Sequence, residues 1–181
     1  MLACKHRNGA RSGPNRNCIT AVYSGRGAAQ NAPLYVWHFQ PGRCMQCEDP
    51  PCVKACPTKA SYNGADGVVY VDEDRCIGCS SCIAACPYQA RFKHPAYGIA
   101  DKCDYCLEGR NNGLEPACVH VCPTRARIFG DADDPASEVS KILAEYKAEN
   151  ALTYVESRET PTTPSLVYLG HTHPKDWPQQ V

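Results

Sequence analysis

Four cysteines in the middle of the chain have the spacing C-x2-C-x2-C-x3-C: Cys76, Cys79, Cys82 and Cys86. A proline, Pro87, follows the last of them. Thiolates at this spacing hold [4Fe–4S] clusters in proteins. Three sulfurs two residues apart can surround one face of a cuboidal cluster, while the fourth, expected to start a helical turn, points away from its own loop. Gly78 suits this loop, because glycine tolerates positive φ and a close approach of the backbone to inorganic sulfide.

Two further cysteine motifs flank this one, and together the three form an internal repeat. The first is Cys44-x2-Cys47-x4-Cys52-x3-Cys56, and the third is Cys103-x2-Cys106-x11-Cys118-x3-Cys122. Each motif ends in a short apolar segment, expected to form a helical turn into its last cysteine. In two-cluster ferredoxins the fourth cysteine of a motif binds the neighbouring cluster. That rule predicts two complete sites: Cys44, Cys47, Cys52 with Cys86, and Cys76, Cys79, Cys82 with Cys56.

The third motif is incomplete by the same rule. Cys103, Cys106 and Cys118 need a fourth thiolate, while Cys122 is directed to a further cluster. Two cysteines, Cys4 and Cys18, lie outside the motifs. A lone cysteine is usually a buried, inert small hydrophobe, and we interpret Cys18 in this way.

Disulfides and zinc are the alternatives to clusters. Twelve of the fourteen cysteines fall in motifs with metal-ligand spacing, and no secretory signal precedes them, which argues against a disulfide scaffold. Zinc needs four ligands at each site, whereas the central motif presents three closely spaced cysteines and directs the fourth elsewhere. Iron–sulfur clusters are therefore the favoured interpretation.

The amino-acid composition gives no indication of a nucleic-acid partner or of a membrane-spanning segment. The chain has 19 basic and 19 acidic residues, so no charge excess indicates a nucleic-acid partner. No apolar run approaches the roughly 18 residues that a membrane helix needs, so we expect no direct membrane span.

The fold class expected is α+β: a ferredoxin-like [4Fe–4S] domain with pseudo-two-fold repeats, short hairpins and helical turns, followed by a C-terminal helix and extension. We divide the chain into an N-terminal segment of the first cluster unit, a polyferredoxin core and a partner-docking extension, at residues 1–33, 34–130 and 131–181. Outside the motifs we expect a helix with Asp134 as N-cap and Pro135 in its first turn. We also expect a loop over 107–117, turns over 61–67, strands at 34–39, 68–71, 152–155 and 166–169, and a solvated tail at His171 and His173.

A family resemblance rests on specific segments: Arg43–Cys52, Asp74–Cys79, Cys86–Tyr88, Asp101–Cys106 and Glu115–Cys118. Over about residues 33–146 the chain resembles the four-cluster iron–sulfur subunit of molybdopterin oxidoreductases of the DMSO-reductase type. The polysulfide, thiosulfate, tetrathionate and arsenate reductase branch is the most similar. This family begins with one more four-cysteine motif, and its first and last motifs exchange their fourth cysteines.

The resemblance implies how the third motif is completed. Cys4 corresponds to the last cysteine of the family's first motif, and the three cysteines before it are absent from the chain. Cys4 would then complete the site of Cys103, Cys106 and Cys118, and Cys122 would lack its cluster, unless Cys122 closes the third site itself. We therefore expect three [4Fe–4S] clusters in this chain, or four if the true start lies upstream.

The function implied is electron transfer, not catalysis. The resemblance implies a molybdopterin-containing catalytic subunit and a membrane-anchored, quinone-reactive subunit as partners. It also implies membrane association through them, on the periplasmic side by co-export, with a cytoplasmic location as the alternative. A free soluble polyferredoxin is the alternative function. Cations that flank the cysteines either raise cluster potentials or are solvated surface charges: Arg43, Lys54, Lys59, Arg75, Lys102 and Arg125.

Overall fold

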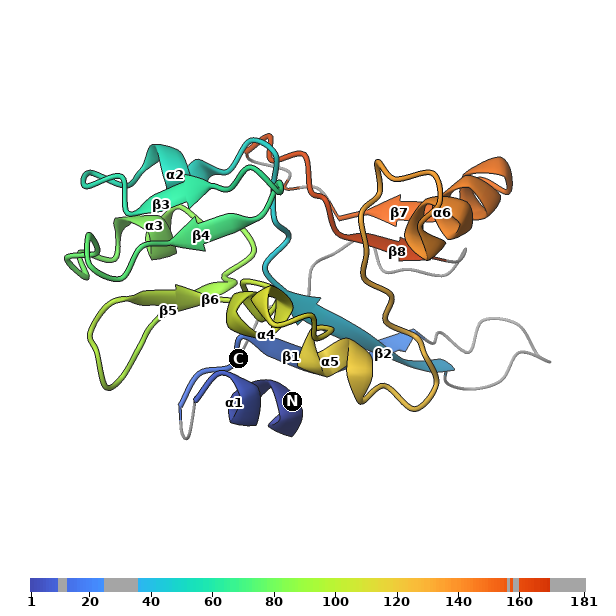
Figure 1. The fold of residues 1–181 in the computed structure, drawn as a ribbon, viewed down its shortest axis with the longest axis horizontal. Helices are drawn as coiled ribbons and strands as arrows, with labels where there is room; N and C mark the ends of the chain where they lie inside the picture. Colours follow the sequence, from blue (N-terminus) through green and yellow to red (C-terminus); the bar gives the residue numbers. More distant parts are fainter. Residues whose placement is uncertain (10–12, 25–35, 156, 158–159, 170–181) are drawn as a thin grey trace.

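The computed structural model describes residues 1–9, 13–24, 36–155, 157 and 160–169, and shows a small α+β protein (Figure 1). The tail around His171 and His173 lies outside the described residues. The helices are α1 (Leu2–Arg7), α2 (Pro51–Lys54), α3 (Ser81–Ala84), α4 (Leu107–Asn111), α5 (Ala117–His120) and α6 (Glu138–Ala148). The strands are β1 (Asn17–Ser24), β2 (Val36–Arg43), β3 (Ser61–Asn63), β4 (Val69–Val71), β5 (Arg91–Lys93), β6 (Ala100–Lys102), β7 (Leu152–Tyr154) and β8 (Val167–Leu169).

The strands form short antiparallel hairpins, as the sequence predicted. β3 pairs with β4, β5 with β6, and β7 with β8. The first two cysteine motifs share one local plan, in which a one-turn helix that carries the third cysteine is followed by a hairpin. The fourth cysteine follows the helix and does not start it, because α2 and α3 end two residues before Cys56 and Cys86. β3 also occupies residues that we had expected to form only turns.

The hairpin of β1 and β2 leads the chain into the first motif. Asn17 of β1 lies opposite Arg43 of β2, immediately before Cys44. The expected strand at 34–39 falls partly outside the described residues, and β2 continues beyond it to Arg43. Pro41 is tolerated in β2 because each strand of a two-stranded ribbon has a free edge. The hairpin and α1 give residues 1–9 and 13–24 a structure that the weak periodicity of this segment did not predict.

Two other expectations were wrong in detail. The segment 107–117 is not all loop, because α4 occupies Leu107–Asn111. Helix α6 begins at Glu138, and its N-cap is Ser137, whose side chain accepts a hydrogen bond from the Ser140 N–H at 3.1 Å. Asp134 instead closes a turn before the helix, since its carboxylate accepts from the Ala136 N–H at 2.8 Å.

Cysteines together with apolar and tyrosine side chains form the core beside the hairpins. The larger cluster of buried residues contains Cys44, Met45, Cys47, Tyr88, Ala90, Cys103, Val155 and Tyr168. The segment before β8 covers the first motif: Ser165 N–H donates to Met45 O at 3.1 Å, and Glu48 N–H donates to Thr163 O at 3.0 Å. Within the described residues, none of the helices has the length and apolarity to cross a membrane.

Candidate iron–sulfur sites

Four thiols from the first and second motifs surround one cavity. Cys44, Cys47, Cys52 and Cys86 line this cavity, together with Tyr88, Arg91 and several prolines. We call these four cysteines the first site. The loop before α2 supplies Cys44 and Cys47, α2 supplies Cys52, and the turn after α3 supplies Cys86. Cys86 thus lies with the first motif and not with its own, as the ferredoxin rule predicts.

The electrostatics of the first site favour a cationic occupant. Burial raises the pKa of Cys47 to about 12, and the neighbouring Cys44, Cys52 and Cys86 thiols raise it further. Burial also raises the pKa of Cys52 to about 11, against the lowering effect of the Arg91 guanidinium. Four thiolates in one buried cavity repel one another, so they ionise together only around positive charge such as iron.

The second site consists of Cys56, Cys76, Cys79 and Cys82. These thiols line a second cavity, with Ser61, Gly78 and Ala100 in its wall. Backbone N–H groups of the hairpins point at two of the sulfurs: Ser61 N–H lies 3.4 Å from Cys56 Sγ, and Ala100 N–H lies 3.5 Å from Cys76 Sγ. Burial opposes ionisation of Cys56, but hydrogen bonds from Ser61 and Thr58 lower its pKa.

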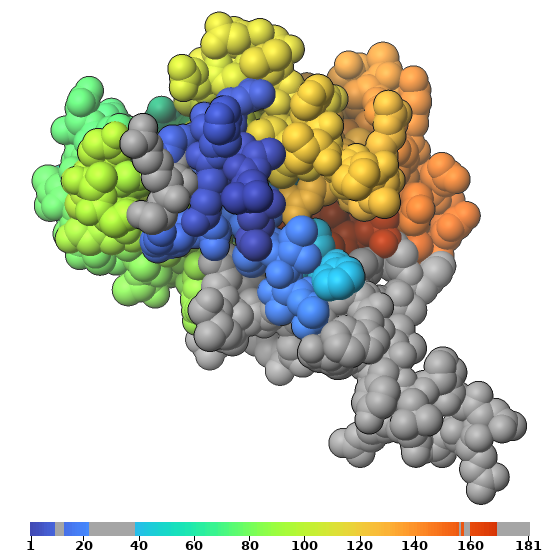
Figure 2. Space-filling view, turned by 90° about the horizontal axis from the view of Figure 1, so that it is seen from below, coloured from blue at the N-terminus to red at the C-terminus, as the bar shows by residue number. Residues whose placement is uncertain are grey.

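We call Cys4, Cys103, Cys106 and Cys118 the third site, and the structure brings the Cys4, Cys106 and Cys118 thiols close together. Burial raises the pKa of Cys4 to about 11, and the nearby Cys106 and Cys118 thiols raise it further. Helix α1, which carries Cys4, packs against α5, which carries Cys118. Figure 2 shows α1, in dark blue, lying against the yellow surface formed by α4 and α5. Of the two candidates for a fourth thiol, the structure places Cys4 beside this motif.

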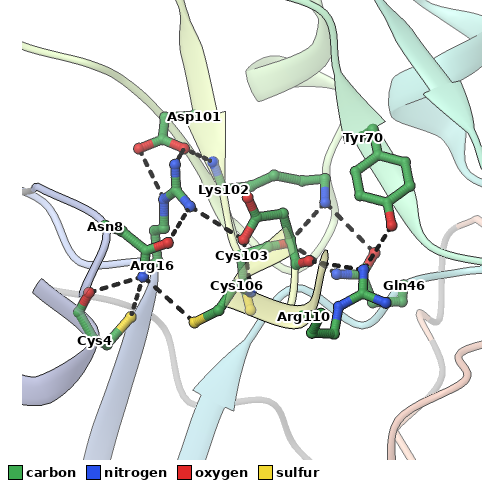
Figure 3. Close-up of polar contacts among 11 residues, drawn as sticks. Cys4, Asn8, Arg16, Gln46, Tyr70, Asp101, Lys102, Cys103, Cys106 and Arg110 are labelled. Atoms are coloured by element: carbon green, nitrogen blue, oxygen red, sulfur yellow. Dashed lines mark hydrogen bonds and ion pairs between the residues drawn. The ribbon is translucent and has the colours of Figure 1, made fainter. Parts of the chain in front are cut away.

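An ordered amide bridges two thiols of the third site. Asn8 Nδ2 lies 3.7 Å from Cys4 Sγ and 3.6 Å from Cys106 Sγ (Figure 3). Its oxygen accepts from Arg16 Nη1 at 2.9 Å, and Arg16 can only donate, so the NH2 group must face the sulfurs. Arg16 is held in turn by Asp101 and Asp104, at 2.8 and 3.1 Å. Neither Asn8 nor Arg16 has a sequence signal that singles it out.

Cys122 and Cys18 lie outside the three sites. Cys122 is half-buried and lines an open apolar groove with Ile19, Phe39 and Leu143. Its Sγ lies 3.7 Å from Thr124 Oγ1. Cys18 lies on β1, and its thiol donates to Gly42 O at 3.5 Å, which agrees with the interpretation of an inert structural thiol.

One backbone feature recurs in all three motifs. The residue before the second cysteine has a left-handed backbone: Gln46 has φ 49°, Gly78 has φ 66° and Tyr105 has φ 55°. For a residue other than glycine this conformation costs about 1–2 kcal/mol. Such strain is typical of functional loops. The third motif, despite its long insertion, therefore begins with the same kind of loop as the other two.

Buried cations lie between the sites without carboxylate partners. Arg43, Arg91 and Lys102 are 7%, 4% and 2% exposed, and none of them forms an ion pair with a described carboxylate. Arg43 Nη1 lies 3.8 Å from Cys118 Sγ, and Lys102 Nζ donates to Cys103 O at 2.7 Å. A buried charge without a partner costs several kcal/mol. Anionic iron–thiolate groups would supply the missing negative charge, so the residues fit such clusters.

The other flanking cations are surface charges. Lys54, Lys59, Arg75 and Arg125 are exposed. Lys54 pairs with Asp49 at 2.6 Å, where solvent screens the interaction. The six cations that the sequence grouped together therefore divide into two buried side chains, Arg43 and Lys102, and four solvated ones. Arg91 joins the buried group, and sequence reasoning missed it because it lies five residues beyond Cys86, outside the motif.

The spacing of the thiols differs from that of a mononuclear site. Zn–S bonds of about 2.3 Å bring the sulfurs of a tetrahedral zinc site to roughly 4 Å from one another. Across the part of the chain that the structure describes, no group of three His, Cys, Asp or Glu side chains has the arrangement of a site for one metal ion. The thiols of the first and second sites are instead spread around cavities.

A family model and several known proteins match this chain. Residues 35–132 match the family described as the 4Fe-4S dicluster domain. The chain is similar to a component of the polysulfide reductase of Wolinella succinogenes, with 57% identity over 102 residues that cover 56% of this chain and 53% of the relative. It is 43% identical to a putative iron-sulfur subunit of the dimethyl sulfoxide reductase of Halobacterium salinarum, over 73% of this chain and 55% of the relative.

A third relative is a subunit of the tetrathionate reductase of Salmonella typhimurium, with 42% identity over 72% of this chain and 51% of the relative. The chain therefore spans about half the length of the curated relatives it matches. The family match covers more than half of the 181 residues and contains all three cysteine motifs. This chain belongs to the 4Fe-4S dicluster domain family.

Proposed function

We propose that this chain is an electron-transfer subunit that holds three [4Fe–4S] clusters and is not itself catalytic. The observation that carries the proposal is the arrangement of three sites made of cysteines. Buried cations that form no ion pair with a described carboxylate lie between them. A bound [4Fe–4S] cluster takes up and returns single electrons. Ligation of every iron by thiolate leaves no open position for a substrate.

The proposed ligands are the cysteines of the three sites. Cys44, Cys47, Cys52 and Cys86 hold the first cluster, and Cys56, Cys76, Cys79 and Cys82 hold the second. Their exchange of fourth cysteines is the pseudo-two-fold plan of two-cluster ferredoxins. Cys4, Cys103, Cys106 and Cys118 hold the third cluster. Cys122 is not a ligand of any of these three clusters.

The surroundings of the sites suit a relay along the molecule. Arg91 lies beside thiols of the first and second sites. Arg43 directly precedes Cys44 of the first site, and its guanidinium lies beside thiols of the third site. The second site reaches the surface, because Cys79 is exposed and Ile77 beside it is 68% exposed. Electrons can therefore enter or leave at this end without crossing a thick protein layer.

The partners proposed are a molybdopterin-containing catalytic subunit and a membrane, quinone-reactive subunit. Support comes from the relatives, whose names describe components of polysulfide, tetrathionate and dimethyl sulfoxide reductases. The chain would associate with the membrane through these partners, on the periplasmic side. A free soluble polyferredoxin is the second candidate, and the exposed edge of the second site suits it as well.

Anaerobic purification from the native host tests the proposal. An electron-transfer subunit should copurify with a molybdenum-containing protein, and its broad visible absorption should bleach with dithionite and return when the partner's oxidant is added. A brown monomer that carries the same clusters but no molybdenum partner would favour the free carrier. A colourless protein would contradict both.

A further inference from the structure

Arg91 enters the wall of the first site from the start of β5. Its side chain is only 4% exposed, and it lines the first cavity with Cys44, Cys52 and Cys86. Two of these thiols, Cys52 and Cys44, are its strongest electrostatic neighbours. The guanidinium therefore lies where it would face a cluster held by the first site.

The same side chain reaches the second site. Arg91 Nη1 donates to Ser61 Oγ at 2.8 Å. Ser61 lines the second cavity, and its N–H lies 3.4 Å from Cys56 Sγ. Cys82, another second-site thiol, is the next electrostatic neighbour of the guanidinium. One buried cation thus lies between two sulfur-lined cavities and touches the wall of each.

The charge of Arg91 is not neutralised by the described part of the protein. Its Nε and Nη2 atoms are buried and have no nitrogen or oxygen acceptor among the described residues, and on the second-site side the guanidinium also hydrogen-bonds the Cys82 thiol. No described carboxylate forms an ion pair with it. Buried arginines are normally paired, so these N–H groups suit an anionic acceptor such as an iron–thiolate cluster.

We propose that the Arg91 guanidinium raises the reduction potentials of both the first and the second cluster, because its positive charge lies between the two sites. This inference rests on the proposed clusters. One-electron reduction adds a negative charge to a cluster, and a nearby buried cation stabilises the reduced form. Because the guanidinium lies in a medium of low dielectric, mobile ions screen its effect much less than that of a surface cation.

The test compares Arg91→Gln with Arg91→Lys and with a surface control. Arg75→Gln is the control, because Arg75 flanks the second-site cysteine Cys76 but is exposed. Redox-titrated EPR of the full chain gives the midpoint potential of each cluster, and iron analysis confirms loading. In Arg91→Gln both midpoints should fall by at least about 59 mV, a tenfold change in the reduction equilibrium. Arg91→Lys should shift both by less than half as much, and Arg75→Gln should leave both near the wild-type values.

A fully loaded Arg91→Gln protein in which only one midpoint falls, or neither, would overturn the proposal. If Arg91→Gln loses iron, Arg91→Lys decides: restored clusters with midpoints close to wild type support the charge, and failure to restore them overturns it. A wild-type chain without clusters would instead refute the proposed function.

Discussion

Asn8 Nδ2 lies 3.6 Å from Cys106 Sγ, although 98 residues separate the two in sequence. The contact joins α1 to the third motif. It depends on Arg16, whose guanidinium accepts no hydrogen bond and therefore fixes which end of the Asn8 amide faces the sulfurs. The third site is thus assembled from the N-terminal segment and the third cysteine motif.

Replacing Asn8 should affect the third cluster alone. Asn8→Ala removes one N–H donor to the cluster sulfurs, and donors of this kind stabilise the reduced state. The potential of the third cluster should fall by tens of millivolts, because one hydrogen bond contributes about 1 kcal/mol. Redox-titrated EPR measures the shift. Asn112→Ala is the control, since Asn112 is exposed and its side chain donates to Glu108 O, away from the thiols. Equal shifts in the two variants would refute the assigned role of Asn8.

The exchange of fourth cysteines makes a selective prediction for Cys86. Cys86→Ser should perturb the first cluster and spare the second, because Cys86 lines the first cavity and not the cavity of its own motif. EPR spectra of the partly reduced protein distinguish the two signals. Cys18→Ser should change neither, since the Cys18 thiol donates to the β2 backbone and lines neither cavity. Loss of the second signal alone would contradict the pairing.

Gly78 should be required for the second site for two separable reasons. Both Gly78 and Gly67 have positive φ, +66° and +73°, so alanine at either position costs about 1–2 kcal/mol of backbone strain. Only at Gly78 would the new Cβ meet another backbone group, the Gly98 carbonyl. Gly78→Ala should therefore release second-site iron to a chelator much faster than Gly67→Ala does. Equal release rates would show that strain alone matters.

The cysteine spacing predicted more of the site than of the fold. Spacing is a local property, and the ferredoxin rule extends it to the grouping of Cys44 with Cys86, which the structure contains. It left open whether Cys4 or Cys122 lies beside Cys106, because that choice depends on how α1 packs against α5. Only tertiary structure carries this information.

The side chains around the thiols could not be predicted for the same reason. Arg75 flanks a cysteine and Arg91 lies outside the motifs, yet Arg91 is buried between two sites and Arg75 is exposed. Helix α4 forms in a segment rich in glycine and asparagine because the chain around Cys106 and Gly109 is buried, and burial overrides weak local propensity. The hairpin of β1 and β2 is likewise fixed by pairing across a long connection.

At the start of α6, the N-cap expected from the sequence is Asp134 and the N-cap in the structure is Ser137. Ser137→Ala should destabilise the first turn of α6 by about 1 kcal/mol, because Ser137 Oγ caps the Ser140 N–H. Amide exchange in that turn should accelerate about fivefold. Asp134→Ala should have a smaller effect there, since its carboxylate bonds Ala136 outside the helix. A larger effect of Asp134→Ala than of Ser137→Ala would show that Asp134 is the N-cap, as the sequence suggested.

Iron and acid-labile sulfide analysis of the anaerobically reconstituted chain tests the central claim most directly. Three [4Fe–4S] clusters predict about twelve irons and about twelve sulfides for each chain. Cys4→Ala, which removes the α1 thiol beside Cys106 and Cys118, should lower both toward about eight. Bound metal without sulfide would contradict the account, as would a count that Cys4→Ala leaves unchanged.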